Sequence, residues 1–184
     1  MGEVYSKLHG SEKGMGDLLL AAYDRSVQTA KDRRARLVAI DPNAGATKPM
    51  DYTLAGVNGD RIDLKTLRGK VVVLDFWATW CGPCRVQYPM YERVKQSYKG
   101  RNDIVFLGIN TDQDRAVVKP FLQEQKWNKA VYFEDGLSQM LKVSSIPTTI
   151  IFDRNGELSA RMNGFVPDRF EQMLSERIKE ALGN

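Results

Sequence analysis

The sequence predicts an α/β domain built on a mixed β-sheet with helices on both faces. Continuous apolar runs typical of buried strands begin near residue 70, helical patterns lie between them, and the chain closes with a hairpin and a helix. Strand–helix–strand order followed by hairpin–helix order combines parallel and antiparallel pairs in one sheet. The 184 residues, 42% hydrophobic and 27% charged, suffice for one packed domain and an extension.

Residues 1–46 form the extension in this prediction, a helix and a linker, and residues 47–184 form the domain. Between residues 17 and 40, apolar residues recur at helical spacing, at Leu19, Tyr23, Val27 and Ala30. The stretch Asp41-Pro42-Asn43-Ala44-Gly45 then ends the helix. Two interpretations stand side by side: a helix packed on the domain, and a helix that docks a partner or ends an upstream helical repeat.

The elements of the domain follow in order from residue 50. A first hairpin is indicated by two short strand patterns on either side of a glycine-containing turn, Tyr52-Thr53-Leu54 and Ile62-Asp63-Leu64. Further strands are predicted at 71–77, 104–109, 130–133 and 148–152, and helices at 83–98, 115–126, 137–141 and 167–182. The turn Asp153-Arg154-Asn155-Gly156 predicts a second hairpin that returns over 157–163, because Asn-Gly supplies the positive φ of a tight turn.

Composition and charge argue against several classes of protein. The net charge is only +4, and one basic cluster without interleaved aromatic residues predicts a solvated helix face, not a nucleic-acid site: Lys31, Arg33, Arg34 and Arg36. No apolar run approaches the roughly 18 residues of a membrane-spanning helix, and we expect no export signal in the chain. Two cysteines and the distant His9 exclude a disulfide scaffold and argue against structural zinc, so we expect no metal.

The two cysteines form a C-x-x-C motif, Cys81-Gly82-Pro83-Cys84, between a buried strand and a predicted helix. A helix N-terminus carries unpaired N–H groups and partial positive charge, which lower the pKa of a thiol below its free value of about 8.5. The thiolate is the attacking species in disulfide exchange, which proceeds through a mixed disulfide. We therefore expect Cys81 to be the exposed nucleophile, and Cys84, one turn into the helix, to be buried and to resolve the mixed disulfide.

Residues 75–84, Asp-Phe-Trp-Ala-Thr-Trp-Cys-Gly-Pro-Cys, resemble the active-site stretch of thioredoxin. Further family features match in chain order: the helix-kinking Pro89, the cis-proline loop Ile146-Pro147-Thr148, and Gly164 beside the substrate groove. The first hairpin with Leu67-Arg68-Gly69-Lys70, and the long stretch 112–143, resemble the TlpA- and ResA-like branch. Members of that branch are extracytoplasmic and membrane-tethered, and often reduce apocytochrome or other exported thiols. The resemblance covers about residues 50–184.

This resemblance implies a thioredoxin-like mixed sheet with an N-terminal β-hairpin extension and an additional N-terminal helix. It implies no cofactor beyond a redox-active Cys81–Cys84 disulfide. The catalytic residues that it implies are Cys81, Cys84 and Asp75, with buried Asp75 as general base for Cys84. The substrate-binding residues that it implies are Trp80, Gly82, Pro83, Ile146, Pro147 and Gly164. We expect Trp80 at the rim of the site, where an indole shields the nucleophile from water, and Trp77 in the core.

Two departures from the branch concern the acid of the site. The branch commonly has a glutamate shortly after the second cysteine, where this chain has Gln87, and often has Asn where this chain has Asp75. Thioredoxin also has a lysine near its buried acid, on the neighbouring strand. Residues 104–107, Ile-Val-Phe-Leu, offer none. We therefore expect Asp75 to lack a cationic partner in this domain.

The function predicted from these residues is thiol-disulfide exchange that reduces protein disulfides. Gly82-Pro83 carries neither a charge nor an imidazole that would stabilise the reduced thiolate, which favours a potential nearer about −270 mV than about −120 mV. A thiol-dependent peroxidase is one alternative, but the required proline before Thr79 is absent. A copper-binding or redox adaptor module is another, but the domain contains no histidine.

The partners expected are protein substrates with thiols or disulfides and an upstream thiol reductase, and no nucleic acid. Membrane contact is expected only through an anchor outside this chain. The resemblance favours a periplasmic or other extracytoplasmic location, and the absence of a visible export signal leaves the cytoplasm as the alternative.

Overall fold

The computed structural model describes residues 2–9 and 14–183. These residues divide into two compact units, one up to Gly45 and one from Ala46 onward, each described by itself. The first unit contains α1 (Gly2–His9) and α2 (Met15–Ile40). Helix α2 covers the stretch with the helical repeat, and its basic cluster is exposed, as predicted: Lys31, Arg33, Arg34 and Arg36. Both interpretations of this helix stay predictions.

The second unit is an α/β domain. Its strands are β1 (Thr53–Ala55), β2 (Arg61–Asp63), β3 (Val71–Trp77), β4 (Ile104–Asn110), β5 (Val131–Phe133), β6 (Thr148–Phe152) and β7 (Leu158–Asn163). Its α-helices are α3 (Gly82–Ser97), α4 (Val118–Glu124), α5 (Leu137–Met140) and α6 (Pro167–Leu182). Short 3-10 turns lie at Pro49–Asp51 (η1), Leu64–Leu67 (η2) and Arg115–Val117 (η3). The predicted mixed α/β class is confirmed.

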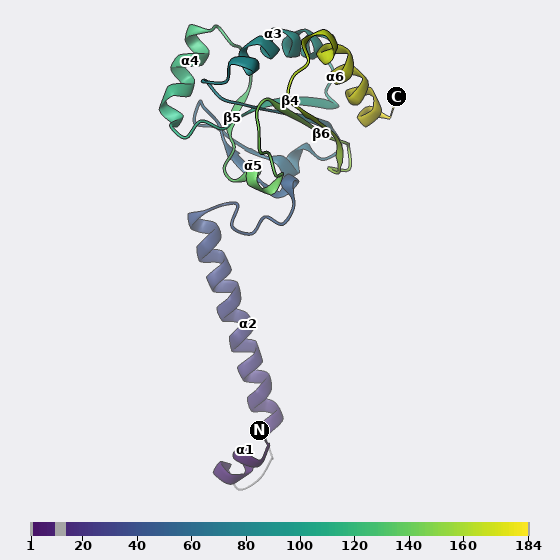
Figure 1. Ribbon diagram of the computed structural model, residues 1–184. Helices are drawn as coiled ribbons and strands as arrows, with labels where there is room; N and C mark the ends of the chain where they lie inside the picture. The colour runs from purple at the N-terminus through teal and green to yellow at the C-terminus, as the bar shows by residue number, and fades with distance from the viewer. Residues whose placement is uncertain (1, 10–13, 184) are drawn as a thin grey trace. The chain divides into compact units, whose positions relative to one another are not determined.

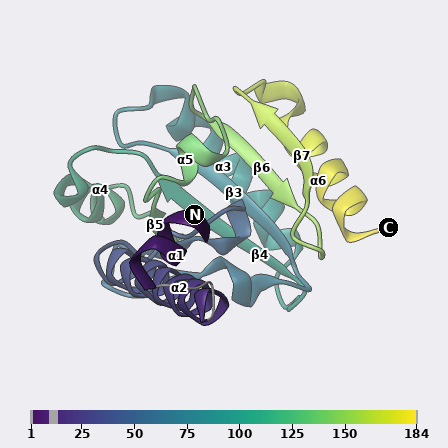
Figure 2. The same ribbon diagram turned by 90° about the horizontal axis from the view of Figure 1, so that it is seen from below.

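The main sheet has five strands in the order β5-β4-β3-β6-β7 (Figure 2). Strand β3 pairs in parallel with β4 and antiparallel with β6, and β1 and β2 form the separate predicted hairpin. Every residue of β3 is buried, because it is central and apolar layers cover both faces. The register places Asp75 opposite Gly108 and Trp77 opposite Asn110, so the ends of β3 and β4 coincide.

Helices α3 and α6 cover one face of the sheet, and the first hairpin and α5 cover the other (Figure 1). Beneath α3 and α6, side chains such as Tyr91 and Leu174 pack on Val71 and Val73 of β3. On the opposite face, Leu54 and Leu137 pack with residues that alternate along the same strand, Val72, Leu74 and Phe76. A third cluster joins the carboxyl end of β3 to α4. The chemistry of the site lies at that end.

The helix predicted over 115–126 is shorter than expected. It begins as a 3-10 turn, in which the Asp114 side chain accepts from the Ala116 N–H at 2.9 Å, and becomes α-helical only from Val118. It ends at Glu124, and Lys126 takes a left-handed conformation with φ of 54°. An Asp that caps its own turn favours such a short local start over a regular helix.

Candidate active site

Cys81 and Cys84 lie at the start of α3, just after the turn that follows β3. Cys81 is the N-cap residue of α3, and the Cys84 N–H donates to Cys81 Sγ at 3.2 Å. The two residues form a disulfide, with 5.3 Å between their Cα atoms. The first sulfur therefore sits among the unpaired N–H groups of a helix N-terminus, where negative charge is stabilised. This is the arrangement that the C-x-x-C spacing predicted.

The exposure of the two cysteines differs from the prediction. Cys81 is 3% exposed and Cys84 is 4% exposed, so the expectation that Cys81 reaches the surface is wrong for the disulfide state. Both cysteines belong to the apolar cluster that includes Trp77, Val118 and Phe121. By contrast Gly82 and Pro83 are exposed, and Trp80 is 70% exposed, as expected for a residue at the rim.

Asp75 lies under the first turns of α3. It is 4% exposed, and Gln87 Nε2 donates to its Oδ1 at 3.0 Å. Gln87 stands three residues after Cys84, so both side chains are on the same buried face of the helix. The structure thus joins the predicted acid to the buried face of α3 that also carries Cys84, with Gln87 as the hydrogen-bond donor.

Lys129 overturns the expectation that Asp75 has no cationic partner. Lys129 Nζ lies 3.2 Å from Asp75 Oδ2, with 3% of the lysine side chain exposed and 5% of the aspartate side chain. The neighbouring strand β4 carries no lysine, and this one comes instead from the segment just before β5. The ammonium lies 4.3 Å from the Trp77 ring centroid and 5.1 Å from that of Trp127, within cation–π range.

Gly108 makes room for this lysine. It is the residue of β4 opposite Asp75, and a Cβ there would come within 2.9 Å of Lys129 Cε and 3.2 Å of Trp77 Nε1. The Lys129 side chain therefore passes over Gly108, which has no side chain, and reaches Asp75. Gly108 indicates space for a reaching side chain only once the strand register is known, so the sequence alone does not point to Lys129.

Burial and charge shift two neighbouring titrations. Burial lowers the pKa of Lys129 below its ordinary value, and the nearby Asp75 carboxylate opposes that shift. Burial, with the Asp75 charge as a second cause, raises the pKa of Tyr91 well above 10.0. An ion pair at the centre of the domain is thus held at the cost of desolvation.

The predicted substrate-binding residues come from the turn and first residues of α3 and from two loops, one before β6 and one after β7. The Ile146–Pro147 peptide bond is cis, and the Gly164 N–H donates to the Pro147 carbonyl oxygen at 2.8 Å, so the two loops lie side by side. Ile146 packs against the apolar cluster that contains both cysteines. It also shares a hollow of about 230 Å³ with Trp80, lined in addition by Thr111, Ser138, Val143, Ser144 and Ser145. The structure therefore brings the proline loop to the rim of the disulfide.

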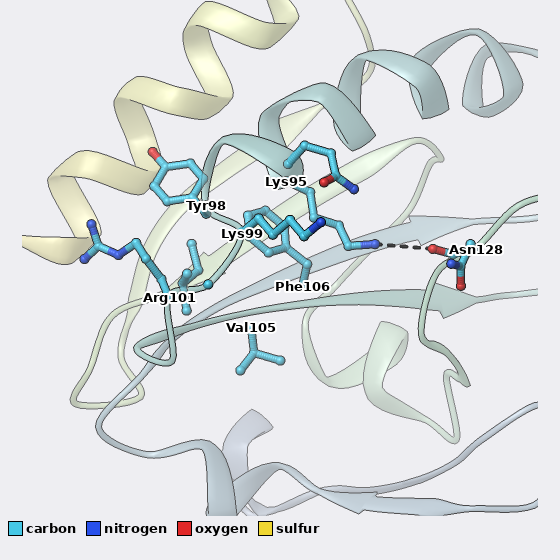
Figure 3. A pocket seen from close by; sticks show the side chains of 10 residues that line it. Lys95, Tyr98, Lys99, Arg101, Val105, Phe106 and Asn128 are labelled. Atoms are coloured by element: carbon cyan, nitrogen blue, oxygen red, sulfur yellow. Dashed lines mark hydrogen bonds between the residues drawn. The ribbon is translucent and has the colours of Figure 1, made fainter.

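A hollow of about 530 Å³ lies elsewhere, at the amino end of β4 (Figure 3). Lys95, Lys99 and Arg101 give it a basic lining over Phe106, and Lys95 points toward the Asn128 carbonyl. Two of these cations are already paired, Lys95 with Glu92 at 3.0 Å and Arg101 with Asp103 at 2.7 Å. It has no cysteine in its lining and lies at the opposite end of the sheet, so the redox site is not there.

Among residues 2–9 and 14–183, no group of three or more metal-ligating side chains converges. Within the same part of the chain, no helix combines the length and the apolar character needed to cross a bilayer.

Comparisons with known proteins agree with this geometry. A family model described as thioredoxin-like matches residues 69–158. The thiol-disulfide oxidoreductase ResA of Geobacillus kaustophilus is 29% identical over 149 residues, which are 80% of this chain and 82% of ResA. A crystal structure from Chlorobium tepidum, provisionally named as a thiol:disulfide interchange protein DsbE, is 32% identical, with a TM-score of 0.66 over 74% of this chain and 96% of that one. The chain therefore belongs to the thioredoxin-like thiol-disulfide oxidoreductases, in the branch that resembles TlpA and ResA.

Proposed function

We propose that this thiol-disulfide oxidoreductase reduces disulfides in polypeptide substrates, using Cys81 and Cys84 as its dithiol. The observation that carries the proposal is the cysteine pair at the N-terminus of α3, beside a hollow that Trp80 shares with the Ile146 loop. A helix N-terminus stabilises a thiolate, and a groove beside it gives a polypeptide a place to lie.

The reaction is a two-electron exchange in two steps. The Cys81 thiolate attacks one sulfur of the substrate disulfide, forming a mixed disulfide and releasing the other substrate sulfur as a thiolate that takes up a proton. Cys84 then loses its proton and attacks Cys81 Sγ, which closes the enzyme disulfide and releases the second substrate thiol. The substrate gains two electrons and two protons, and the enzyme dithiol is oxidised. An upstream dithiol reductase restores the enzyme by the reverse exchange.

We assign to Asp75 the role of accepting the proton that Cys84 loses. Its carboxylate lies under the first turns of α3, held by Gln87 on one oxygen and by Lys129 on the other. A fixed carboxylate is suited to accept the proton when Cys84 becomes the attacking thiolate. The Gln87 amide cannot accept a proton in this way, so the proposed base is Asp75 on β3.

The substrate polypeptide is proposed to lie across Trp80, Gly82 and Pro83 on one side and Ile146, Pro147 and Gly164 on the other. The exposed residues among these supply a docking surface, whereas buried Pro147 shapes the loop. Because hydroxyl groups dominate the lining of the shared hollow and no charged side chain takes part, a neutral extended segment fits it better than a strongly charged one.

We propose an extracytoplasmic site of action, on the resemblance to ResA, with exported proteins that contain thiols or disulfides as substrates. A dithiol that keeps exported cysteines reduced needs a supply of electrons from an upstream thiol reductase.

Insulin reduction tests the proposal. The wild-type protein with dithiothreitol should precipitate insulin B chain faster than dithiothreitol alone, and Cys81→Ser should fall to the background rate. Equilibration with glutathione should place the potential near about −270 mV, because Gly82-Pro83 offers no charge to stabilise the thiolate. A potential well above about −200 mV would overturn the reducing assignment.

A further inference from the structure

Thr79 stands two residues before Cys81, in the turn from β3 to α3, and each of its hydrogen-bonding groups is held. Its N–H donates to Asp112 Oδ2 at 2.8 Å, and its hydroxyl donates to Asp112 Oδ1 at 2.7 Å. Its carbonyl oxygen accepts from Nε and Nη2 of Arg85, at 3.2 and 2.8 Å. A carboxylate and a guanidinium thus fix one turn residue from two sides, by charge-assisted hydrogen bonds.

Asp112 is itself tied to the sheet. Asn110 Nδ2 donates to Asp112 Oδ2 at 2.7 Å, and the Asp112 N–H donates to Asn110 Oδ1 at 3.1 Å. Asn110 is the last residue of β4, is 1% exposed, and lies opposite Trp77 in the parallel register. The carboxylate that holds Thr79 is therefore anchored to β4, which in turn pairs with β3.

Trp80 follows Thr79 directly, and it lines two hollows. One is the hollow of about 230 Å³ shared with Ile146. The other measures about 590 Å³ and lies toward η3 and α4, where Val117 and Phe121 line it. Because Trp80 is 70% exposed, packing holds its ring only weakly, so its place depends on the backbone of Thr79.

We propose that Asp112 is a positioning residue for polypeptide substrates. Through Thr79 it fixes the backbone of Trp80, and so the shape of the surface on which a polypeptide approaches Cys81. The inference rests on the proposed reduction of protein disulfides. A small disulfide reagent does not need this surface, so loss of Asp112 affects the two kinds of substrate differently.

The first test compares two substrates of the full chain. For Asp112→Ala, kcat/KM for insulin should fall about tenfold, chiefly through a higher KM, because two charge-assisted hydrogen bonds are lost. The rate with 5,5′-dithiobis(2-nitrobenzoate) should stay within about twofold, because the cysteine pair itself is untouched. Equal loss with both substrates would overturn the proposal.

Thr79 provides graded variants in case Asp112→Ala folds poorly. Thr79→Val loses the hydroxyl bond but keeps the N–H bond, so insulin kcat/KM should fall about threefold. Thr79→Ser keeps both bonds and should stay within about twofold of the wild type. A Thr79→Ser loss as large as that of Thr79→Val would contradict the role of the hydroxyl.

Asp153 gives a matched control. Its Oδ1 accepts from the N–H groups of Asn155 and Glu157, at 2.9 and 3.0 Å, in the β6–β7 turn at the opposite end of the sheet. Asp153→Ala removes a comparable turn anchor, and the ratio of insulin to small-disulfide rates should not change. If the ratio shifts as much as in Asp112→Ala, the effect is one of general stability and the proposal falls.

A spectroscopic readout separates this inference from the proposed function. The indole N–H signal of Trp80, assigned with Trp80→Phe, should shift or broaden in Asp112→Ala and Thr79→Val but not in Asp153→Ala. An unchanged signal in both variants contradicts the positioning role even if insulin is reduced. If wild-type protein fails to reduce insulin, the proposed function falls, and the indole signal still decides whether Asp112 positions Trp80.

Discussion

Asp75 is a buried carboxylate held by one amide and one ammonium, and its chemistry depends on both. Gln87 donates to Oδ1 and Lys129 to Oδ2. In the TlpA- and ResA-like branch the acid commonly stands at the helix position and the amide at the strand position. In this chain the acid, Asp75, is on the strand and the amide, Gln87, is on the helix, and a hydrogen bond joins them.

Substitutions at Asp75 and Gln87 test which of the two side chains accepts the proton of Cys84. Asp75→Asn should slow release of substrate from the mixed disulfide more than the initial attack, because Cys84 loses its proton acceptor. Adding Gln87→Glu should recover part of the release rate by returning a carboxylate to the same hydrogen-bonded pair. Rapid quench of the mixed disulfide with acid and mass spectrometry measures both steps. Equal slowing of attack and release in Asp75→Asn would remove the base role.

Lys129→Met should destabilise the domain by about 3–5 kcal/mol, because Asp75 is then a buried charge without its cation. The double variant with Asp75→Asn should be more stable than Lys129→Met alone, because no unpaired charge remains. Urea unfolding of the four proteins measures the coupling. A Lys129→Met protein as stable as the wild type would contradict a buried ion pair.

The difference in unfolding free energy between wild type and Lys129→Met should depend on pH. Burial lowers the pKa of Lys129 in the folded protein, so the unfolded chain binds this proton more tightly. The resulting penalty on stability is complete below the folded pKa and is relieved as pH rises from that value toward 10.5. Wild type should therefore gain unfolding free energy relative to Lys129→Met as pH rises through this range. A relative loss would contradict the direction of the shift.

At the scale of elements, β4 supplies space as well as hydrogen bonds. Gly108 lies opposite Asp75, and the Lys129 side chain occupies the space that a Cβ would need. Gly108→Ala should displace Lys129 from Asp75 and destabilise the domain by about 1–3 kcal/mol, because the added Cβ would overlap the buried Lys129 and Trp77 side chains. Gly16→Ala in α2, where a Cβ meets nothing within 4 Å, should not destabilise it. Thermal unfolding of both variants decides, and an unaffected Gly108→Ala would show that the pocket yields easily.

The elements also mark where sequence reasoning succeeds and where it stops. Strands such as 71–77 and 148–152 appear within a residue of their predicted bounds, because continuous β-branched runs have few alternative structures. The cysteine pair is local in sequence, so its place at a helix start could be predicted. Lys129 is 54 residues from Asp75, and Asp112 is 33 from Thr79. Such pairings depend on strand register, which the pattern alone does not supply.

At the scale of the whole molecule, the thioredoxin-like domain is expected to carry the activity. All the residues assigned to the reaction, from Asp75 to Gly164, lie in the unit that begins at Ala46. A protein of residues 46–184 should therefore fold and reduce insulin within about twofold of the full-length rate, since no core residue of that unit is removed. Circular dichroism and the insulin assay check this prediction. A soluble but inactive fragment would assign a catalytic part to residues 1–45.

The most direct measurement is the capture of a covalent intermediate with Cys84→Ser. Incubated with a disulfide-containing polypeptide, this variant should accumulate a mixed disulfide that peptide mass spectrometry locates on Cys81, and dithiothreitol should release it. Cys81→Ser should accumulate none at a comparable rate. A mixed disulfide formed equally well on Cys84, or none at all with Cys84→Ser, would contradict dithiol exchange initiated at the N-terminus of α3.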